Sequence, residues 1–363
     1  MVKIYCKNTG TSKEFEEGTY LGDMVQAFEF DKPYDILAAK VNNVAQGLRF
    51  KVYHSLDVEF LDYRTYTGRN FYCRSLCFLL FKAVKDLFPE SKLTIRRPIS
   101  KGYYCAVDKG DSSPLTEADV DAVRERMAKI VEDDIPFRRH EARVEDAIKT
   151  FTALGAMDKV KLLETCGDVY ITYYTLDGTA DYYYDELVPS SGYLKTWSVS
   201  LYKEGILLRV PDRHHPEDLA PFREQPKTFE VFKESHKWNG IMGLGNVGDV
   251  NESILSGKAS DLIQIAEALQ EKKIVQIAEE IERRHCDPVK PLRLVLITGP
   301  TSSGKSTFCK RLSIQLRPAG SIRSLSRPTI ISSTGSTLPN CRTDPSTLTI
   351  STRSTMTISR KIF

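Results

Sequence analysis

A glycine-rich segment from Gly299 to Ser306, which reads GPTSSGKS, constrains this chain more than any other feature. Its spacing matches G-x-x-x-x-G-K-S, the pattern of a loop that binds phosphate groups. The apolar run at 292–297 before it is typical of a buried parallel strand. After it, Phe308, Leu312 and Leu316 recur every four residues, as on one face of a helix. Strand, loop and helix in this order predict the beginning of an α/β phosphate-binding domain.

The residue types of the loop suit a triphosphate with Mg²⁺. Gly299 and Gly304 allow backbone angles at which successive N–H groups turn towards phosphate oxygens, and the positive end of the helix dipole adds to the attraction. Lys305 is expected to reach the β- and γ-phosphates and the Ser306 hydroxyl to ligate Mg²⁺. The predicted nucleotide-binding residues are Gly299, Thr301, Ser302, Ser303, Gly304, Lys305, Ser306 and Thr307. The alternative is a Gly/Ser-rich turn without a ligand, which the agreement of motif and context disfavours.

The overall composition is that of a folded protein without a membrane span. Hydrophobic residues make up 41% of the 363 and charged residues 27%, and no run of 18 apolar residues occurs. The eight cysteines include no C-x-x-C pair, and the N-terminus has no secretory signal, so we expect a cytoplasmic location. The formal charge is +3, but residues 318–363 alone carry +5, which leaves −2 for the rest. Charge therefore gives no support for nucleic-acid binding by the body of the chain.

The first 64 residues predict a small mixed domain. Val2, Ile4 and Cys6 alternate with polar residues, as in a half-buried strand. The expected elements are strands at 2–6, from Phe15 onwards, at 36–41 and at 57–60, and a short helical face at 21–28. This order resembles a β-grasp fold. The segment AAKVNN, followed by VEFLD and a Tyr/Thr/Gly stretch, resembles the TGS domain of threonyl-tRNA synthetases.

Residues 65–225 predict a second domain of mixed helices and strands. An amphipathic helix is expected from Phe71 to Phe88, a strand at 102–108, and a helix after Thr116, which makes a capping signal with Asp119. The order RSLCFLLFKAVKDLFP, GYYCAVD, LTEADVDAVRERM and PFRRHEARVEDAIKTF resembles the second N-terminal domain of threonyl- and alanyl-tRNA synthetases. It directly follows the TGS-like segment, as in that family.

The resemblance also implies a metal-ligand set, which this sequence lacks. The family carries an H-x-x-x-H pair on the first helix and a C-x-x-x-H pair later in the chain. The four aligned positions are here Arg74, Phe78, Tyr183 and Leu187. Arginine, phenylalanine and leucine do not coordinate zinc, and tyrosine is a poor substitute. We therefore expect a retained fold without its hydrolytic site, in a regulatory or binding role. Cys73 and Cys77 could in principle bind metal, but without a second pair they are more simply buried thiols.

Three further motifs have plain explanations. The tyrosine-rich stretch 170–184 turns at Asp177-Gly178, a hairpin signal, and its tyrosines are expected to pack in a sheet, with base stacking as the alternative. His214-His215 lacks a third ligand at a useful spacing. Gly243 to Gly248 reads GLGNVG, but no proper strand precedes this G-x-G-x-x-G and no ribose-binding acid follows at the usual distance. We therefore expect neither a metal nor a dinucleotide at these segments.

A helix is predicted from Ser260 to His285, because apolar residues recur on one face of that segment. Together with the phosphate loop, this run resembles a bacterial nucleoside kinase family, in which a TGS domain and a synthetase-like domain precede a uridine kinase-type domain. The resemblance covers about residues 1–316. It implies ATP and Mg²⁺ as cofactors, a nucleoside as substrate, and transfer of the γ-phosphoryl group to the nucleoside 5′-hydroxyl.

Residues 318–363 change composition abruptly, since 19 of these 46 residues are Ser or Thr. The kinase family continues here into a strand that ends in an Asp-Asp-x-Tyr segment, in which one Asp resembles the general base. This chain has only Asp344, with no strand before it. We interpret the tail as out-of-frame translation or a mis-assigned gene end. The alternative is a genuine disordered Ser/Thr-rich tail.

Together these patterns predict an α+β multidomain protein that ends in the start of an α/β kinase domain. The expected parts are a TGS-like domain at 1–64, a synthetase-like domain without metal ligands at 65–225, a helical connector at 226–290, an incomplete P-loop kinase domain at 291–317, and the aberrant, disordered tail at 318–363.

The expected function is that of an ATP-binding nucleoside kinase-like protein of the uridine kinase type. We expect it to be inactive in this form, because the catalytic base is missing, and no catalytic residue is assigned. One alternative is a synthetase-related module that binds tRNA or other RNA, and another is a sensor that binds ATP or GTP without catalysis. A nucleoside triphosphate is the expected partner, while tRNA is disfavoured by the negative charge of the body.

Overall fold

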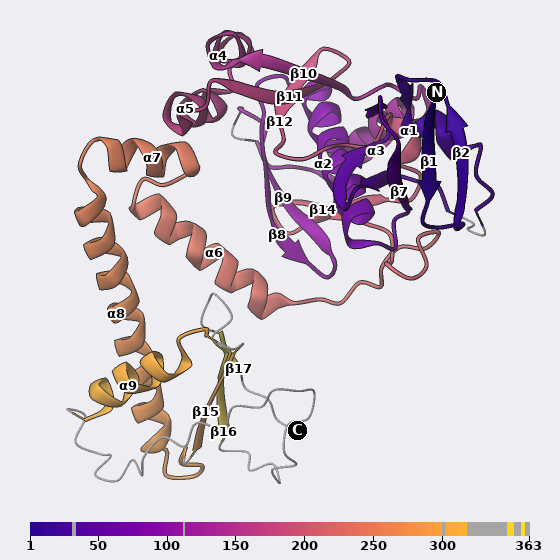
Figure 1. Cartoon of the computed structure of the whole chain (residues 1–363). Helices are drawn as coiled ribbons and strands as arrows, with labels where there is room; N and C mark the ends of the chain where they lie inside the picture. Colours follow the sequence, from indigo (N-terminus) through magenta and orange to yellow (C-terminus); the bar gives the residue numbers. More distant parts are fainter. Residues whose placement is uncertain are drawn as a thin grey trace. The chain divides into compact units, whose positions relative to one another are not determined.

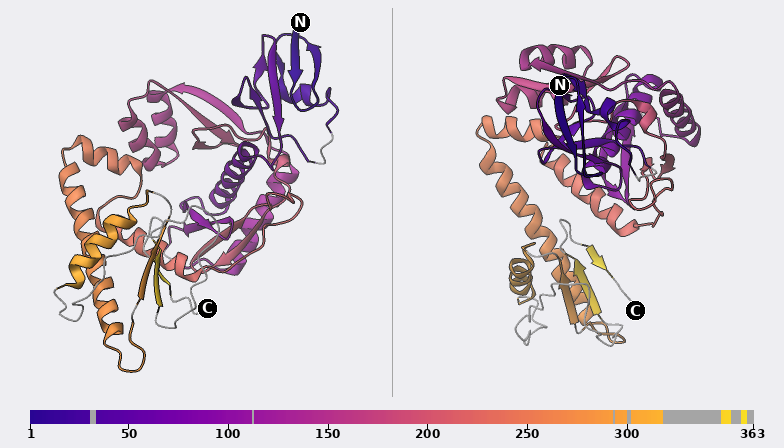
Figure 2. Two further views of the ribbon diagram at one scale, coloured as in Figure 1. Left: turned by 60° about the horizontal axis from the view of Figure 1, so that its bottom comes forward. Right: turned by 45° about the vertical axis from the view of Figure 1, so that its right-hand side comes forward.

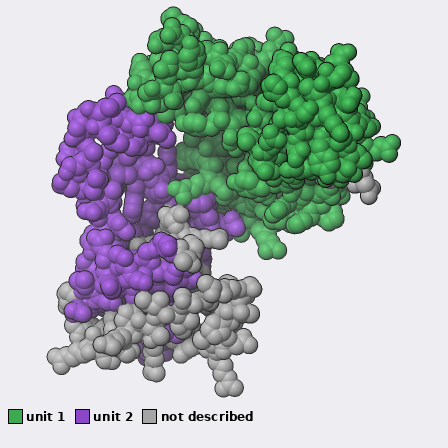
Figure 3. Space-filling model, viewed as in Figure 1, with its two compact units in different colours: residues 1–224 green, residues 225–363 purple. Residues whose placement is uncertain are grey.

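The structure, a computed structural model of the chain, falls into two compact units, residues 1–224 and residues 225–363 (Figure 3). It describes residues 1–30, 34–111, 113–292, 294–299, 302–317, 347–351 and 357–359. Within those ranges, no helix is both long enough and apolar enough to cross a membrane. The division into five parts expected from the sequence is finer than this division into two, and it stays a prediction.

The first unit begins with a five-stranded sheet in the order β2-β1-β7-β4-β5 (Figure 1). Its strands are β1 (Val2–Cys6), β2 (Thr11–Phe15), β4 (Ala38–Val41), β5 (Val44–Gly47) and β7 (Leu56–Leu61). The smaller elements of this part are β3 (Thr19–Tyr20), β6 (Lys51–Val52) and the helix α1 (Leu21–Val25). β1 and β7 run parallel and the other neighbours run antiparallel. A mixed sheet with one short helix is the arrangement of a β-grasp domain.

The local signals of this sheet are partly as expected. β1 buries Val2, Ile4 and Cys6 and exposes the residues between them, which confirms the alternation. Asn42 and Asn43 turn the chain between β4 and β5 with φ of 48° and 68°, left-handed values that asparagine tolerates better than most residues. The expectation that a strand begins at Phe15 is wrong. β2 ends there, because Phe15 lies opposite Val2 at the end of the antiparallel β1–β2 hairpin.

The remainder of the first unit is built around one long helix, α2 (Tyr66–Leu87). The predicted helix is present as α2, but it is not amphipathic, since nearly every side chain from Phe71 to Val84 is buried. The cause is that α3 and strands of three sheets, β4, β8 and β11, pack around α2. Even Lys82 is only 5% exposed, and its ammonium pairs with the Asp86 carboxylate at 2.7 Å.

Two antiparallel sheets and three further helices complete this part (Figures 1 and 2). The four-stranded sheet, in the order β13-β14-β9-β8, consists of β8 (Lys92–Ile99), β9 (Gly102–Asp108), β13 (Ser198–Tyr202) and β14 (Gly205–Arg209). The three-stranded sheet consists of β10 (Arg138–Arg143), β11 (Tyr170–Leu176) and β12 (Thr179–Tyr182). The helices are α3 (Glu117–Glu132), α4 (Val144–Ala153), α5 (Met157–Cys166) and the 3-10 turn η1 (Ser191–Tyr193).

Two sequence signals in this part are confirmed. Thr116 and Asp119 form the reciprocal hydrogen bonds of a capping box at the start of α3. Asp177 and Gly178 both have positive φ, 44° and 79°, and they join β11 to β12 in a two-residue hairpin. In each case the signal is local, because the bonded partners lie within a few residues of each other.

The second unit contains four helices within its described residues (Figure 1). They are α6 (Pro226–Ile241), α7 (Val247–Leu255), α8 (Ala259–His285) and α9 (Lys305–Leu316). The predicted helix at 260–285 is thus present as α8, but only its second half is buried. There Ile274, Ile277 and Ile281 pack with Phe308 and Leu312 of α9. In the first half, Leu262 and Leu269 of the predicted apolar face are half-buried, and the other side chains from 261 to 270 are exposed.

Strand β15 (Leu294–Thr298) precedes α9, as the sequence predicts. It pairs in parallel with β16 (Thr347–Ser351), which pairs in turn with the antiparallel β17 (Thr357–Ser359). The expectation of a buried strand is wrong for one face, because Leu294 and Leu296 are 46% and 40% exposed while Val295 and Ile297 pack against the α8–α9 core.

The C-terminal tail was expected to be disordered throughout, but β16 and β17 form two short strands within it. Backbone pairing with the edge of β15 is the reason, since an open edge accepts any extended segment regardless of its side chains. Residues 318–346, 352–356 and 360–363, and with them Asp344, lie outside the described residues.

Candidate functional site

The four positions aligned with the metal ligands of synthetases come from two distant segments, and the structure brings those segments together. Arg74 and Phe78 lie one turn apart on α2, and the other two positions belong to the segment after β12. The Phe78 ring lies 5.5 Å from the Tyr183 ring, centroid to centroid, and the Arg74 guanidinium pairs with the carboxylate of Asp185. Leu187 is buried in the same core cluster as Phe78. The positions therefore meet, although their side chains are not metal ligands.

The chemistry at this position does not fit a metal ion. Burial raises the pKa of Tyr183 well above its ordinary value, so its hydroxyl stays protonated and is unsuited to coordination. Burial likewise raises the pKa of the Cys73 and Cys77 thiols, which therefore disfavours the thiolate form that binds metals. No group of three or more His, Cys, Asp or Glu side chains within the described part of the chain is arranged to hold an ion. Phe78, which is fully buried, instead packs against Phe137 and Tyr183.

A partly buried ion pair lies near this position. The Lys159 ammonium at the start of α5 is 3.0 Å from the Asp181 carboxylate on β12, and the two side chains are 29% and 12% exposed. Burial alone would lower the pKa of Lys159, but the attraction of the Asp181 carboxylate outweighs it, so the pKa is raised. Lys159 therefore stays charged, and the pair ties α5 to the edge of the β10–β11–β12 sheet.

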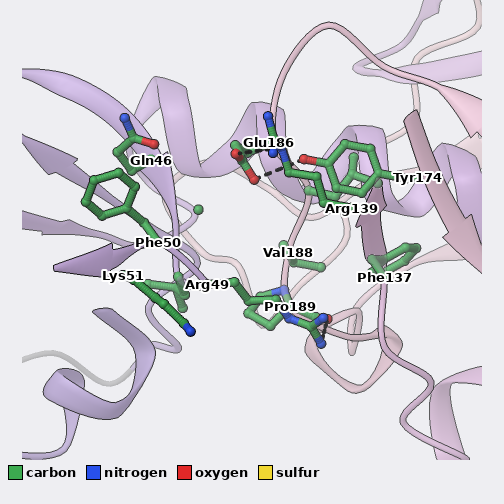
Figure 4. A pocket seen from close by; sticks show the side chains of 13 residues that line it. Gln46, Arg49, Phe50, Lys51, Phe137, Arg139, Tyr174, Glu186, Val188 and Pro189 are labelled. Atoms are coloured by element: carbon green, nitrogen blue, oxygen red, sulfur yellow. Dashed lines mark hydrogen bonds and ion pairs between the residues drawn. The ribbon is translucent and has the colours of Figure 1, made fainter. Parts of the chain in front are cut away.

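A pocket of about 350 Å³ lies between the β-grasp part and the segment 186–189 (Figure 4). It is lined by Gln46, Gly47, Leu48, Arg49, Phe50, Lys51, Phe137, Arg139, Tyr174, Glu186, Leu187, Val188 and Pro189. Three of these are cationic and one is anionic, so the lining carries a net charge of about +2. The pocket also reaches Leu187, the last of the four former ligand positions.

Two polar groups mark opposite sides of this pocket (Figure 4). On one side, the Tyr174 hydroxyl donates to Glu186 at 3.0 Å, and the Arg139 guanidinium lies 3.6 Å from the same carboxylate. Burial, reinforced by Glu186, raises the pKa of Tyr174, so its hydroxyl remains a donor. On the other side, the Arg49 guanidinium donates to the carbonyl oxygen of Pro189 at 2.9 Å.

A strip of basic and aromatic side chains continues from the pocket along β10. Arg139, Glu141 and Arg143 lie on one face of the strand because alternate residues share a face, and the Arg139 guanidinium lies 3.5 Å from the Glu141 carboxylate. Arg139 is opposite Tyr174, and Arg143 is opposite Tyr170. The Arg143 guanidinium lies 5.9 Å from the centroid of the Tyr170 ring, which is 58% exposed. Exposed rings beside arginines can stack with nucleobases.

The phosphate-loop residues lie at the junction of β15 and α9. Gly299 follows β15 directly, and Gly304 is the N-cap of α9. Ser302 and Gly304 have left-handed φ of 59° and 78°, which turn the backbone sharply before the helix. Lys305 is half-buried. The remaining predicted residues are Ser303 in the same turn, Ser306 and Thr307 exposed on the first turn of α9, and Thr301, which lies outside the described residues.

Two motifs that we expected to be structural lie in ordinary local contexts. His214 and His215 are both exposed, and the nearest acidic group to His215 is Glu217, at 3.5 Å. The Gly243 to Gly248 segment follows helix α6 instead of a strand. Within it, the Asn246 side chain caps α7 by accepting a hydrogen bond from the backbone N–H of Asp249. α7 begins at Val247, within the motif.

The pocket and the Lys159–Asp181 pair were missed by sequence reasoning. Arg49, Arg139 and Glu186 come from three separate segments, and no spacing rule connects such residues. The basic segments GLRFK and PFRRHEAR contain two of them, but such charge runs are usually solvated surface. Only the folded chain shows that they share a cavity.

Comparison with known proteins relates part of this chain to tRNA ligases. No protein-family model matches it. The threonine–tRNA ligase of Desulforamulus reducens is 32% identical over 197 residues, which are 54% of this chain and 31% of that protein. Those of Syntrophomonas wolfei and Porphyromonas gingivalis are 30% and 27% identical over 200 and 195 residues, again about 55% of this chain and about 30% of each relative.

This chain is related to the N-terminal part of threonyl-tRNA synthetases. It spans about a third of the length of the curated relatives it matches. The α+β architecture of the first unit agrees with that relationship. The similarity to these ligases gives no evidence on the strand, loop and helix at 294–316, so a kinase domain there stays a prediction.

Proposed function

We propose that the first unit is a synthetase-derived module that binds the acceptor end of tRNA without hydrolysing an ester on it. The relationship to threonyl-tRNA synthetases supports tRNA as the partner. The observation that carries the rest is the packing of Phe78 against Tyr183 where those relatives are expected to carry metal ligands. A site filled by two rings has no ion to activate water. A cytoplasmic location accompanies this proposal.

Local charge supports tRNA binding more than the net charge of the body does. Arg139, Arg143 and the exposed ring of Tyr170 form a strip that leads to the pocket, and it carries one net positive charge because Glu141 lies between the two arginines. Such a strip suits the unpaired 3′ end of a tRNA, where phosphates attract arginines and bases stack on rings. Net charge alone is a poor guide, because a short basic strip acts within a Debye length of about 8 Å at physiological salt.

The test is a filter-binding titration of tRNA with the full chain at about 0.15 M salt. We expect saturable binding that weakens with added salt. Tyr170→Ala should weaken it by about three- to tenfold through the lost stacking, while Tyr170→Phe should retain it. Arg138→Ala is the matched control, since Arg138 lies on the opposite face of β10 from Arg139 and Arg143.

A companion assay follows aminoacylated tRNA over time. The full chain should leave its rate of deacylation unchanged. Failure to bind tRNA at physiological salt would contradict the proposal, and so would accelerated deacylation that the Arg143→Ala substitution abolishes.

A second candidate function, binding of a nucleoside triphosphate with Mg²⁺ by Gly299 to Thr307, is favoured by a separate observation. The left-handed Ser302 and Gly304 lead into α9, and the first turn of α9 begins with Lys305. In this proposal the loop N–H groups and Lys305 hold the phosphates of ATP, and Ser306 holds Mg²⁺. Transfer to a nucleoside, as in a kinase of the uridine kinase type, would also need a base, and none is assigned.

Binding of a fluorescent ATP analogue to the full chain tests this candidate. Lys305→Ala should weaken binding by about 10- to 100-fold, the usual size of a lost charge-assisted phosphate contact. Lys310→Ala, at an exposed position further along α9, is the matched control. Equal affinity of the two variants would exclude the loop as the binding site. Phosphorylation of uridine by the full chain would contradict our expectation that this form is inactive.

A further inference from the structure

We propose that the pocket between the β-grasp part and residues 186–189 is a binding site for a mononucleotide group. Its phosphate would lie at Arg49, and its sugar or base edge would lie at Glu186. For an RNA end this inference rests on the proposed function, because the strip with Arg139 leads to the same pocket, whereas for a free nucleotide it rests on the shape and chemistry of the cavity. The ligand group can come from a free nucleotide or from the end of an RNA strand.

The pocket separates its two polar ends by an apolar floor. Val188 lies between Glu186 and the Arg49–Pro189 contact (Figure 4). Residues 186 and 189 are three apart, so their backbones can be separated by up to about 10 Å. Val188 and Phe137, which are both buried, form the apolar part of the lining, and the half-buried Phe50 lines the pocket from the β-grasp part. The cavity of about 350 Å³ therefore suits an elongated ligand with polar ends and a planar or apolar body.

The Arg49 end is suited to an anion. A guanidinium carries five N–H donors, and the bond to the Pro189 carbonyl orients it while using one of them. The side chain is exposed, so a ligand can reach it without displacing a buried partner. Arginine pairs with phosphate oxygens through two parallel hydrogen bonds, which selects a phosphate or carboxylate in this place.

The Glu186 end is suited to hydroxyl or amino donors. Its carboxylate accepts from Tyr174 and lies near Arg139, and two carboxylate oxygens have about four acceptor positions in all. It therefore retains capacity to accept from a ribose hydroxyl or a base amino group. The Glu186 carboxylate packs closely against the backbone of Gly47, since a Cβ on Gly47 would lie 2.8 Å from the Glu186 Oε2 atom. Only glycine at position 47 leaves Glu186 where it is.

The separation of the two ends argues against smaller ligands. A free α-amino acid carries its ammonium and carboxylate on one carbon, so it suits groups that lie side by side better than Glu186 and Arg49, which lie on either side of Val188 (Figure 4). Inorganic phosphate would engage Arg49 alone. A nucleoside monophosphate has its anion at one end, hydroxyls and a polar base edge at the other, and a planar ring that can lie against Phe50.

The experiment is calorimetric titration of the full chain carrying Lys305→Ala, so that binding at the phosphate loop is suppressed. The probes are the four ribonucleoside monophosphates, inorganic phosphate, threonine, and a short single-stranded RNA with a 5′-phosphate. We expect one site per chain for at least one nucleotide probe. Arg49→Ala should weaken that binding at least tenfold, Arg49→Lys by less, and Glu186→Gln by about threefold or more. Arg138→Ala should leave it unchanged.

The different probes distinguish a free nucleotide from the end of an RNA strand. Binding of a free monophosphate identifies a soluble nucleotide, and binding of the RNA alone identifies a strand end. Either result supports the site if Arg49→Ala weakens the binding at least tenfold while the melting temperature stays within a degree or two of the parent. The inference is overturned if no nucleotide probe binds, if phosphate or threonine binds as tightly as the nucleotides, or if Arg49→Ala binds like the parent.

Discussion

The former metal position on α2 and the phosphate loop before α9 differ in what each retains. At the former metal position, the backbone segments still meet, but Phe78 and Tyr183 face each other where the aligned family pattern has ligands. At the phosphate loop, the motif residues are present, but β15 is an edge strand whose Leu294 and Leu296 are 46% and 40% exposed. Backbone segments can thus meet in the arrangement of a site although their side chains do not bind metal. Conversely, the residue types of a phosphate loop can stand beside a strand that is partly exposed.

This contrast has an energetic consequence. Replacing polar ligands by rings converts a site into core, because buried aromatic surface stabilises the fold and leaves no group to hydrate. The loop is the opposite case, since Ser302 has a left-handed backbone conformation that costs conformational free energy in any residue but glycine. Substitutions at Phe78 and Gly304 therefore distinguish a region that behaves as core from a strained turn.

The largest effect is expected at Phe78 on α2. Phe78→Ala should lower the free energy of unfolding of the first unit by about 3–5 kcal/mol, because a fully buried ring is replaced by a cavity. Urea denaturation in a Trp238→Phe background measures this through Trp197, then the only tryptophan. Tyr66→Ala on the same helix, 69% exposed, should cost less than about 0.5 kcal/mol. Equal losses for the two would mean that the position is not core.

The next effect is expected at the ion pair beside that site. Lys159→Met should cost about 2 kcal/mol, because it leaves the Asp181 carboxylate partly buried without its partner. Lys149→Met, which breaks the exposed pair with Asp146, should cost nearly nothing.

The pH dependence of this pair follows from the raised pKa of Lys159. A raised lysine pKa contributes stability that is fully present below the unfolded value of about 10.4 and is lost as pH rises through the folded value. The difference between parent and Lys159→Met should therefore be constant from neutral pH to about pH 10 and shrink above it. A difference that already changes around pH 7 would point to another group.

A smaller effect is expected in the phosphate loop. Gly304→Ala should destabilise the second unit by about 1 kcal/mol, because φ of 78° is strained for an L-residue although no atom lies within 4 Å of the added Cβ. Gly304→Asn should cost less, since asparagine tolerates left-handed backbone better. Denaturation followed through Trp238 in a Trp197→Phe background measures both. Equal and negligible costs would show that the turn is relaxed.

The smallest effect is expected on α8, which supports that loop. Hydrogen bonds from Arg283 and Arg284 lower the pKa of Glu280 to about 2. A lowered carboxylate pKa gives stability that is present above the unfolded value of about 4.3 and is lost as pH falls towards 2. Glu280→Gln should therefore cost about 0.5 kcal/mol at pH 7, a size typical of helical pairs, and nothing at pH 2. Glu279→Gln, at an exposed position, is the control for the helix itself.

Sequence reasoning predicted the features that depend on neighbours in the chain. The capping box of Thr116 and Asp119, the Asp177-Gly178 hairpin and the helix at 260–285 were all readable, because each is stabilised by contacts within a few residues. It failed where burial depends on distant segments. The α2 helix is buried on nearly every side, whereas the first half of α8 is largely exposed.

The candidate sites divide in the same way. Alignment with the ligand pairs of the synthetase family picked out Arg74 with Phe78 and Tyr183 with Leu187. The fold shows in addition that Phe78 packs against Tyr183. No pattern in the chain relates Arg49 to Glu186, because they are far apart in sequence and neither belongs to a motif. Their shared pocket exists only because the β-grasp part packs beside residues 186–189.

The sequence by itself determined the order of local elements, the loss of metal-ligand chemistry on α2 and the residue types of the phosphate loop. These are properties of single segments, set by side-chain chemistry and by backbone preferences over a few residues. Tertiary structure alone decided which helix faces are buried, that two rings fill the former metal position, and that two arginines and a glutamate share one cavity. The physical reason is that burial and long-range contact depend on how whole elements pack, which local periodicity does not encode.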